Sequence, residues 1–438
     1  MPSDGDPSPV PSDGDPSPMP SHGDPSPMPS DGDRAKIRQM CEATLRQNWR
    51  EGVRATDRVP FAYTCPSPGH YPWQWYWDSC FTAIAWRHFD RARSERELRS
   101  LLAAQREDGF IGHTIFWNTP LTGRRRFTYN VTSPNATMTA SIQPPVLAWA
   151  WRIAVGDPAS EPAIARHYDW LTAHRDLDGD GLIWIVQPDE SGLDASPQFD
   201  AIWGWRAHDR PGFITLVWRN RKLGYDLRRI ETAGGPVCCE VATNVLYCLS
   251  LMALGRSSLT PTIVERMYNH ATGLFEPLAR PEPRRKPART WAGLAPLALP
   301  DLPEDIGRRL VEEHLLDQKQ FWLPVPPPSV PPTEPSFSTR EDGSLWIRRY
   351  WRGPTWVNAA WLVWLGLTRL GYDEHADALA GRIAAAVIAN GLREYYHPYT
   401  GRGMGAADFG WSSLVMEMLA ADPRAAATSY LRPPDGTG

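Results

Sequence analysis

The sequence predicts an all-α fold, an (α/α)6 barrel in which helical hairpins close into a ring. Apolar residues recur at helical spacing in about eleven segments, joined by loops rich in Gly, Pro and aromatic residues. Convincingly alternating segments are few, and 182–186 is the best candidate for a strand. The chain contains 21 Trp, which are costly to leave in water, so most should be buried or line a cavity. An irregular all-α bundle is the alternative.

The helical segments follow one another at lengths that suit paired helices. Their expected ranges are 35–49, 78–89, 95–105, 145–155, 161–174, 239–254, 261–271, 304–315, 355–370, 375–390 and 411–420. Asp or Ser residues near the start of the second and third ranges are typical of helix N-termini. The proline-rich stretch 324–335 is too short for a domain linker, and we expect an extended loop over one face.

The two ends of the chain are expected to lie outside the barrel domain, which should span residues 34–430. Residues 1–33 repeat a nine-residue unit, PSDGDPSPV and its variants. A segment of Pro, Gly, Ser and Asp cannot form a core, so this stretch is predicted to be a disordered tail. Residues 431–438 are expected to form a flexible C-terminal tail.

Composition excludes several classes of function. The net charge of -4 gives no global field that would favour nucleic acid or an anionic membrane. No apolar run is long enough to span a bilayer, and the N-terminus lacks the charged and apolar regions of a signal peptide. The six cysteines are spaced too irregularly for a disulfide framework, so we expect buried reduced thiols and a cytoplasmic location.

Two segments combine carboxylates with aromatic residues at the ends of predicted helices or strands. The first, Tyr71-Pro-Trp-Gln-Trp-Tyr-Trp-Asp78, ends at a helix start, where Asp78 is either an N-cap or a group that holds a sugar between indole rings. The second runs from 185 to 197 and carries Asp189, Glu190 and Asp194 in a loop. One of these acids could stay protonated if it is desolvated among aromatic residues.

Two later segments have the same character. Tyr350-Trp-Arg-Gly-Pro-Thr-Trp356 opens a predicted helix, and its Arg352 is as well explained by a structural ion pair as by a functional role. Glu394-Tyr-Tyr-His-Pro-Tyr-Thr-Gly401 places a carboxylate just before a Gly-rich turn. Hydrolysis of a glycoside needs one carboxylic acid and one carboxylate, and loops at one end of a closed barrel would bring such groups together.

Two charged motifs have simpler explanations. Asp176-Leu-Asp-Gly-Asp-Gly181 resembles the start of a calcium loop, but Gln187 stands where that loop needs its bidentate Glu, so a turn is favoured. The basic residues of 219–222 could bind a carboxylate, although a charge run more often faces solvent. The basic loop 124–126 has the same two interpretations.

Five motifs, in order and in register, resemble the trehalase-like (α/α)6 enzymes, particularly glycoside hydrolase family 63. Its small bacterial members include mannosylglycerate and glucosylglycerate hydrolases. The matching motifs are Trp75-Tyr-Trp-Asp78, Gln143-Pro-Pro145, Glu190-Ser-Gly-Leu-Asp194-Ala-Ser-Pro197, Tyr350-Trp-Arg-Gly-Pro354 and Glu394-Tyr-Tyr-x-Pro-x-Thr-Gly401. They cover nearly all of residues 60–420, whereas the stretch 203–225 does not align with the glycerate enzymes.

The resemblance implies an inverting α-glycosidase that acts on a small α-glucoside or α-mannoside without a metal or organic cofactor. Asp194 would be the general acid and Glu394 the general base, with their carboxyls about 6.5–9.5 Å apart. The sugar pocket would be shaped by Tyr71, Trp75, Trp77, Asp78, Gln143, Tyr350, Trp351, Gly353 and Trp356. A hydrolase of a neutral α-glucosyl disaccharide and an inactive carbohydrate-binding protein are the alternatives. A terpene cyclase is disfavoured because no D-x-D-D motif is present, and Glu394 argues against a phosphorylase.

Overall fold

The computed structural model describes residues 28–118, 137–204, 210–340 and 350–431. Within these ranges, six helical elements contact one another in sequence to form a closed inner ring. They are α2 (Tyr76–Trp86), α5 (Leu147–Ala154), α9 (Val241–Ala253), the 3-10 helix η5 (Trp291–Ala298), α12 (Val357–Arg369) and η9 (Gly410–Leu414), which continues into α14 (Val415–Leu419) and contacts α2. The ring confirms the predicted (α/α)6 barrel.

The inner elements are apolar around almost their whole circumference because they are covered on both sides. Every residue of α2 is buried, as is every residue of α9 except Met252. A helix that is hydrophobic all round belongs in the core of a large protein. In η5, Pro296 lacks the N–H that a longer α-helix would need, which explains why this ring position holds a 3-10 helix.

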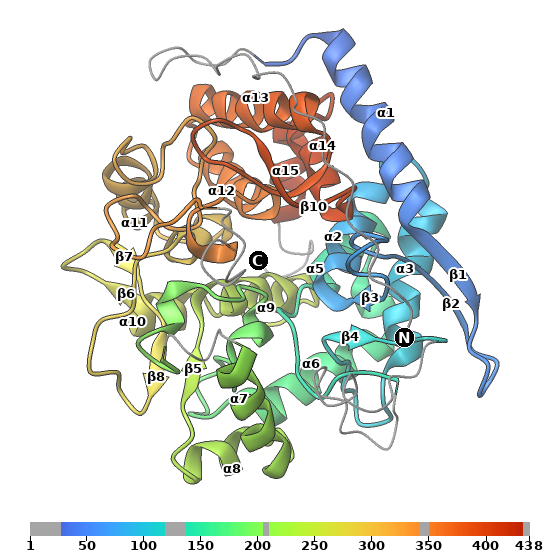
Figure 1. Ribbon diagram of the computed structural model, residues 1–438, viewed down its shortest axis with the longest axis vertical. Helices are drawn as coiled ribbons and strands as arrows, with labels where there is room; N and C mark the ends of the chain where they lie inside the picture. Colours follow the sequence, from blue (N-terminus) through green and yellow to red (C-terminus); the bar gives the residue numbers. More distant parts are fainter. Residues whose placement is uncertain (1–27, 119–136, 205–209, 341–349, 432–438) are drawn as a thin grey trace, which may run out of the picture.

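A second set of helices covers the ring from outside (Figure 1). They are α1 (Asp31–Asn48), α3 (Arg91–Ala104), α6 (Pro162–Arg175), α10 (Thr260–Met267), α11 (Glu304–Arg309) with the π-helical turn η6 (Leu310–Leu315), and α13 (Asp373–Asn390). The first helix, α1, packs against α13 and α14, so the beginning and the end of the barrel meet and close it. The helix α15 (Pro423–Leu431) packs on α12 and α5.

The strands form five short antiparallel pairs rather than one sheet. They are β1 (Trp49–Val53) with β2 (Pro60–Thr64), β3 (Gln74–Trp75) with β4 (Thr114–Ile115), β5 (Val237–Cys239) with β8 (Leu278–Arg280), β6 (Tyr268–Asn269) with β7 (Leu274–Phe275), and β9 (Arg393–Tyr396) with β10 (Gly403–Ala407). In the first pair Trp49 lies opposite Thr64, and in the last Tyr396 lies opposite Gly403. The hairpin of β9 and β10 carries Glu394.

The prediction of a strand at 182–186 is wrong. Ile183 and Ile185 make only isolated bridges, to Asp176 and Cys238. The remaining backbone groups are satisfied by side chains: Asn244 bonds both the N–H and the carbonyl of Ile183, at 2.8 and 2.9 Å. Because these partners replace a neighbouring strand, the apolar alternation is real but no ladder forms.

Two helices occur where none was expected, one within the stretch 203–225 that does not align with the glycerate enzymes and one just after it. These are α7 (Arg210–Lys222) and α8 (Leu227–Thr232), separated by a turn in which Tyr225 has a positive φ. The first helix begins at Asp31 rather than at 35, because the Ser30 side chain of the last repeat accepts the Asp33 N–H as an N-cap. Residues 1–27 and 432–438, and the basic loop 124–126, lie outside the described residues.

Two further features bear on the sequence expectations. All six cysteines are buried and free, as expected for reduced thiols. Among the helices of the described residues, none combines the length and the apolar character that a bilayer crossing requires.

Candidate active site

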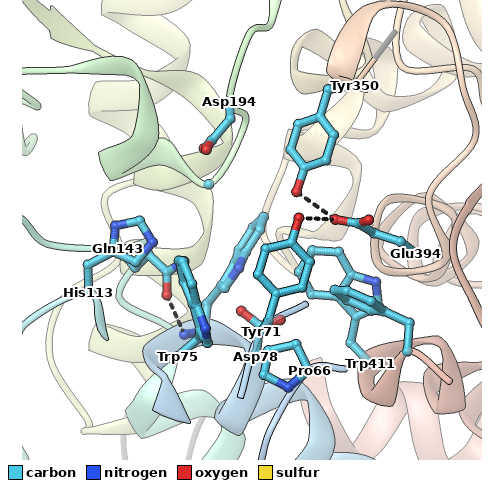
Figure 2. Close-up of a pocket in the computed structure, with 13 residues that line it drawn as sticks. Pro66, Tyr71, Trp75, Asp78, His113, Gln143, Asp194, Tyr350, Glu394 and Trp411 are labelled. Atoms are coloured by element: carbon cyan, nitrogen blue, oxygen red, sulfur yellow. Dashed lines mark hydrogen bonds between the residues drawn. The ribbon is translucent and has the colours of Figure 1, made fainter. Parts of the chain in front are cut away.

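The candidate site lies at the N-terminal ends of the inner helices. Asp78 is in the first turn of α2, Gln143 precedes α5, Tyr350 precedes α12 and Trp411 opens the η9 segment. Because these helices all belong to the inner ring, the segments that lead into them converge on one cavity (Figure 2). The cavity encloses about 350 Å³, including its open mouth.

Glu394 is held on one side of this cavity by three hydrogen bonds. Its Oε1 accepts the hydroxyl of Tyr350 at 2.7 Å and that of Tyr71 at 3.2 Å, and its Oε2 accepts the Ala406 N–H at 2.9 Å. Burial raises the pKa of the Glu394 carboxyl, and the three donors act in the opposite direction. The carboxylate is therefore fixed in one orientation by groups that favour its ionised form.

Gly405, in β10, makes room for this carboxylate. The residue has φ of +66°, and a Cβ at this position would lie 2.6 Å from Oε2 of Glu394. No side chain could be added there without moving the carboxylate, and the left-handed backbone conformation also favours glycine. The Gly-rich turn noted in the sequence is thus part of the site of Glu394.

Asp194 lies on the other side of the cavity, and Figure 2 shows the two residues on opposite sides of it. Burial, together with the negative charge of Glu394, raises the pKa of Asp194 to about 7. Among the described residues, no side chain and no other residue's backbone donates a hydrogen bond to this carboxyl. The two acids therefore have different environments, one rich in donors and one without them.

The loop that carries Asp194 is anchored by a buried ion pair between Glu190, in the same loop, and Arg175. Glu190 accepts two hydrogen bonds from Arg175, both at 2.7 Å, and also accepts the N–H groups of Ile142 and Val186 at 3.0 and 2.8 Å. Both side chains of the pair are almost completely buried. A buried pair with this many satisfied groups fixes the geometry of a segment, because removing either partner would leave an uncompensated charge.

Asp78, Trp75 and Trp77 form the floor and one wall. The residue at the N-cap of α2 is Trp75, so Asp78 is not the N-cap; its carboxyl instead lines the cavity. Burial, and next the charge of Glu394, raise the pKa of Asp78 well above its usual value. The N–H of Trp77 donates to Oε1 of Gln143 at 3.0 Å, which fixes the Gln143 amide beside the pocket.

Eight of the eleven residues expected at the site line the cavity, whereas Trp351, Gly353 and Trp356 do not. Trp351 and Trp356 stack on each other with centroids 3.9 Å apart, and Trp356 also packs edge-on against Tyr350 at 4.9 Å. A Cβ on Gly353 would lie 2.5 Å from the Ser338 carbonyl oxygen. Placing these three in the pocket wall was wrong: they support the Tyr350 turn from behind.

Five residues of the lining were not expected: Pro66, His113, Gly192, Phe409 and Trp411. The aromatic pair follows Glu394 in the sequence and could have been found by the pattern used for the other segments. His113 carries no such signal. Burial lowers the pKa of its imidazole to about 3, so the ring is neutral at physiological pH, and it packs edge-on against Trp75.

Three of the ambiguous charged features have structural roles. Asp176 accepts the N–H groups of Gly179 and Gly181, and Asp178 and Asp180 pair with Arg266, as expected for a turn. The guanidinium of Arg352 makes a bidentate ion pair with Asp200, at 2.9 and 2.6 Å. In the basic run, Arg219 is half-buried and donates to the Asn220 side chain, and Lys222 lies over the exposed ring of Trp218.

Comparison with known proteins assigns the family. The model of the mannosylglycerate hydrolase MGH1-like glycoside hydrolase domain matches residues 71–257 and 252–412. The mannosylglycerate hydrolase of Thermus thermophilus is 29% identical, with 81% of this chain and 95% of the relative covered. The glucosylglycerate hydrolase of Mycolicibacterium hassiacum is 26% identical, with 81% and 93% covered.

Solved structures agree with the sequence relatives. The crystal structure of the family 63 mannosylglycerate hydrolase from Thermus thermophilus in complex with Tris and D-glycerate has a TM-score of 0.71 and 26% identity, over 87% of this chain and 99% of that one. The neutral trehalase Nth1 from Saccharomyces cerevisiae, with a TM-score of 0.51 and 15% identity, shares the fold. The chain therefore belongs to the mannosylglycerate hydrolase MGH1-like glycoside hydrolases of family 63.

Proposed function

We propose that this glycoside hydrolase is an inverting α-glycosidase that cleaves a small α-glucoside or α-mannoside, such as glucosylglycerate or mannosylglycerate. The observation that carries the proposal is that two carboxyl groups in contrasting environments line opposite sides of one cavity. Asp194 is the general acid and Glu394 the general base. When the environments of two titratable groups push their pKa values apart, the groups can take opposite roles.

The contacts of the two groups match these roles. The pKa of Asp194, about 7, leaves a large fraction of this carboxyl protonated near neutral pH, so it can donate to the leaving oxygen. Glu394 receives three hydrogen bonds that favour its ionised form, so it can take a proton from a water molecule. An inverting reaction needs that water between the base and the sugar, and the carboxyl separation of about 6.5–9.5 Å remains our expectation.

The floor of the cavity suits a monosaccharide ring. Trp75 and Trp77 offer apolar ring surfaces to sugar CH groups, while the Asp78 carboxyl and the Gln143 amide can bond hydroxyls. The relatives act on mannosylglycerate and glucosylglycerate by name, and structures of the Thermus enzyme hold D-glycerate or glucose. These names support a glucosyl or mannosyl group in the cavity and glycerate as the leaving group.

A neutral α-glucosyl disaccharide is the second candidate, and one observation favours it. Within the described part of the chain, no Lys or Arg lines the cavity. A glycerate carboxylate would have to lose its hydration without a cation at the described wall, whereas a neutral disaccharide carries no such cost. The substrate is decided by a hydrolysis assay on mannosylglycerate, glucosylglycerate, trehalose, kojibiose and nigerose. Activity confined to the last three would exclude the glycerate assignment, and activity on none would favour a binding protein.

The stereochemistry of the first product tests the inverting mechanism. We expect proton NMR during the first turnovers to show β-glucose or β-mannose, because water activated by Glu394 attacks the face opposite the departing group. The α-anomer should appear only later, by mutarotation in solution. Initial formation of the α-anomer would mean that one carboxylate attacks the sugar directly, and would contradict the assigned base.

The pH dependence follows from the two pKa values. Activity requires ionised Glu394, so kcat/KM should rise with pH through its raised pKa. Activity also requires protonated Asp194, so kcat/KM should fall as the pH passes about 7. The profile should be a bell whose alkaline limb lies near neutrality. A profile that stays flat from about pH 6 to about pH 9 would contradict Asp194 as the acid.

A further inference from the structure

One ion pair connects the two catalytic segments, which are otherwise far apart in the sequence. Asp200 follows Asp194 by six residues, and Arg352 follows Tyr350 by two. The Arg352 guanidinium donates through Nη1 and Nη2 to the two carboxylate oxygens of Asp200, at 2.9 and 2.6 Å. The side chains are only 11% and 28% exposed, so solvent screens the pair less than a surface pair.

We propose that the Asp200–Arg352 ion pair is a positioning element that fixes the general acid and the donor to the general base relative to each other. The inference rests on the proposed roles of Asp194 and Glu394. Neither partner lines the cavity, so the pair acts through the segments that it joins.

On the acid side, the path from Asp200 to Asp194 is a series of tight turns. The Ser196 N–H bonds the Leu193 carbonyl, the Phe199 N–H bonds the Ser196 carbonyl, and the Asp200 N–H bonds the Pro197 carbonyl, at 2.9, 3.2 and 3.1 Å. A displacement of Asp200 is transmitted through these turns, because consecutive hydrogen-bonded turns leave the backbone little freedom. The position of the acid therefore depends on the anchor at residue 200.

On the base side, the turn Tyr350–Arg352 is held from two directions. The stacked rings of Trp351 and Trp356 pack behind it, and Arg352 ties its end to Asp200. Tyr350 is the donor of the shorter of the two tyrosine hydrogen bonds to Glu394, 2.7 Å against 3.2 Å. Releasing Arg352 would loosen this turn and weaken the hydrogen bond that favours the ionised base.

The pH profile separates this role from a merely structural one. Apart from burial, which raises both pKa values, the pKa of Glu394 is lowered by hydrogen bonds from the Ala406 N–H, Tyr350 and Tyr71 and by the charge of His70, and the pKa of Asp194 is raised by the charge of Glu394. The neighbouring acids Asp78 and Asp189 feel the charges of these two carboxyls. Loss of the Tyr350 hydrogen bond would raise the pKa of Glu394 further, which moves the acidic limb of kcat/KM to higher pH. Entry of water around a loosened Asp194 would lower the pKa of that carboxyl, which moves the alkaline limb to lower pH.

The experiment compares Asp200→Asn, Arg352→Gln, Arg352→Lys and the double variant with a matched control. The control is Glu334→Gln, which breaks the 2.6 Å pair of Glu334 with Arg289; this pair lines the same groove as Asp200 but includes no residue of the two catalytic segments. We expect kcat to fall about 10- to 100-fold in the Asn and Gln variants, with a much smaller change in KM and a narrower pH profile. Lysine should restore part of the rate, because it keeps the charge but not the bidentate fork.

The double variant should be no slower than the slower single variant, because the two residues act as one unit. The proposal is overturned if Asp200→Asn or Arg352→Gln keeps the wild-type kcat and pH profile, or if their effects match those of the control.

Binding of the cationic iminosugar 1-deoxynojirimycin, measured by calorimetry against pH, tests the pair without turnover. In the Asp200→Asn and Arg352→Gln variants, the pH dependence of the iminosugar affinity should be shifted relative to wild type. Wild-type enzyme inactive on every glycoside would contradict the proposed function, while an unshifted iminosugar profile would contradict the positioning role.

Discussion

Glu394→Gln should lower kcat by about 10³- to 10⁴-fold, because an amide cannot take a proton from the attacking water. The substitution should keep two of the hydrogen bonds of residue 394, because the glutamine oxygen can still accept from the hydroxyls of Tyr350 and Tyr71. The amide NH₂ would then face the Ala406 N–H, which loses its acceptor at a cost of about 1–3 kcal/mol. We therefore expect a modest fall in Tm alongside the large fall in rate.

The measurement is single-substrate kinetics on the best glycoside of the panel, with glucose or mannose binding followed by calorimetry. Sugar affinity should change little, because Glu394 makes its hydrogen bonds to protein groups. A variant that kept near-native turnover would show that another group activates the water. A variant that lost sugar binding as well would show that Glu394 holds the substrate rather than the water.

Asp194→Asn should lower kcat by about 10²- to 10⁴-fold on a natural glycoside, and much less on an α-glycosyl fluoride. Fluoride leaves without a proton from the enzyme, so the absence of the acid matters less there. Glu394→Gln should be slow on both substrates, because water must be activated in either case. In each variant, the ratio of kcat on the glycosyl fluoride to kcat on the natural glycoside thus assigns the roles. If Asp194→Asn lowered kcat equally on both substrates, the assignment would be contradicted.

The same substitution should stabilise the protein at alkaline pH. Folding raises the pKa of Asp194 from 3.8 to about 7, so in that range the unfolded chain binds fewer protons than the folded one. Asp194 should therefore contribute a fall in the free energy of unfolding of the wild type as pH rises between about 4 and 7, and the Asn variant should lack this contribution. Denaturant unfolding of both proteins at about pH 4 and about pH 8 measures the difference, which should appear only at the higher pH.

The sequence predicted the site best where its residues lie close together in the chain. Trp75, Trp77 and Asp78 enter the cavity from one helix start, and a pattern of aromatic residues ending in a carboxylate was enough to find them. The family resemblance, rather than this pattern, placed Trp351 and Trp356 in the wall. They lie behind it because the turn at Trp351 has a non-helical conformation, with φ of -88° and ψ of 42°, that directs Tyr350 inward instead.

Other features depended on contacts that no local pattern records. His113 reaches the cavity because its segment pairs with β3 and packs on Trp75, and neither contact leaves a motif around residue 113. The segment 182–186 alternates like a strand, yet Asn244 supplies its partners from a helix 61 residues later. Five of the six ring elements were predictable because their segments are apolar and long enough to show their period, whereas η5 lies in no predicted range.

The hydrogen bond from Tyr71 to Glu394 joins residues 323 positions apart. Asp194 comes from the middle of the chain, and α1 closes the barrel only by packing on α13 and α14 near its end. Contacts of such high sequence separation form late, since the loop between them must first be closed. Turnover should therefore be the last native property to return on refolding, after helix content and tryptophan burial. During synthesis, no ribosome-bound chain that ends before Glu394 can carry out the reaction.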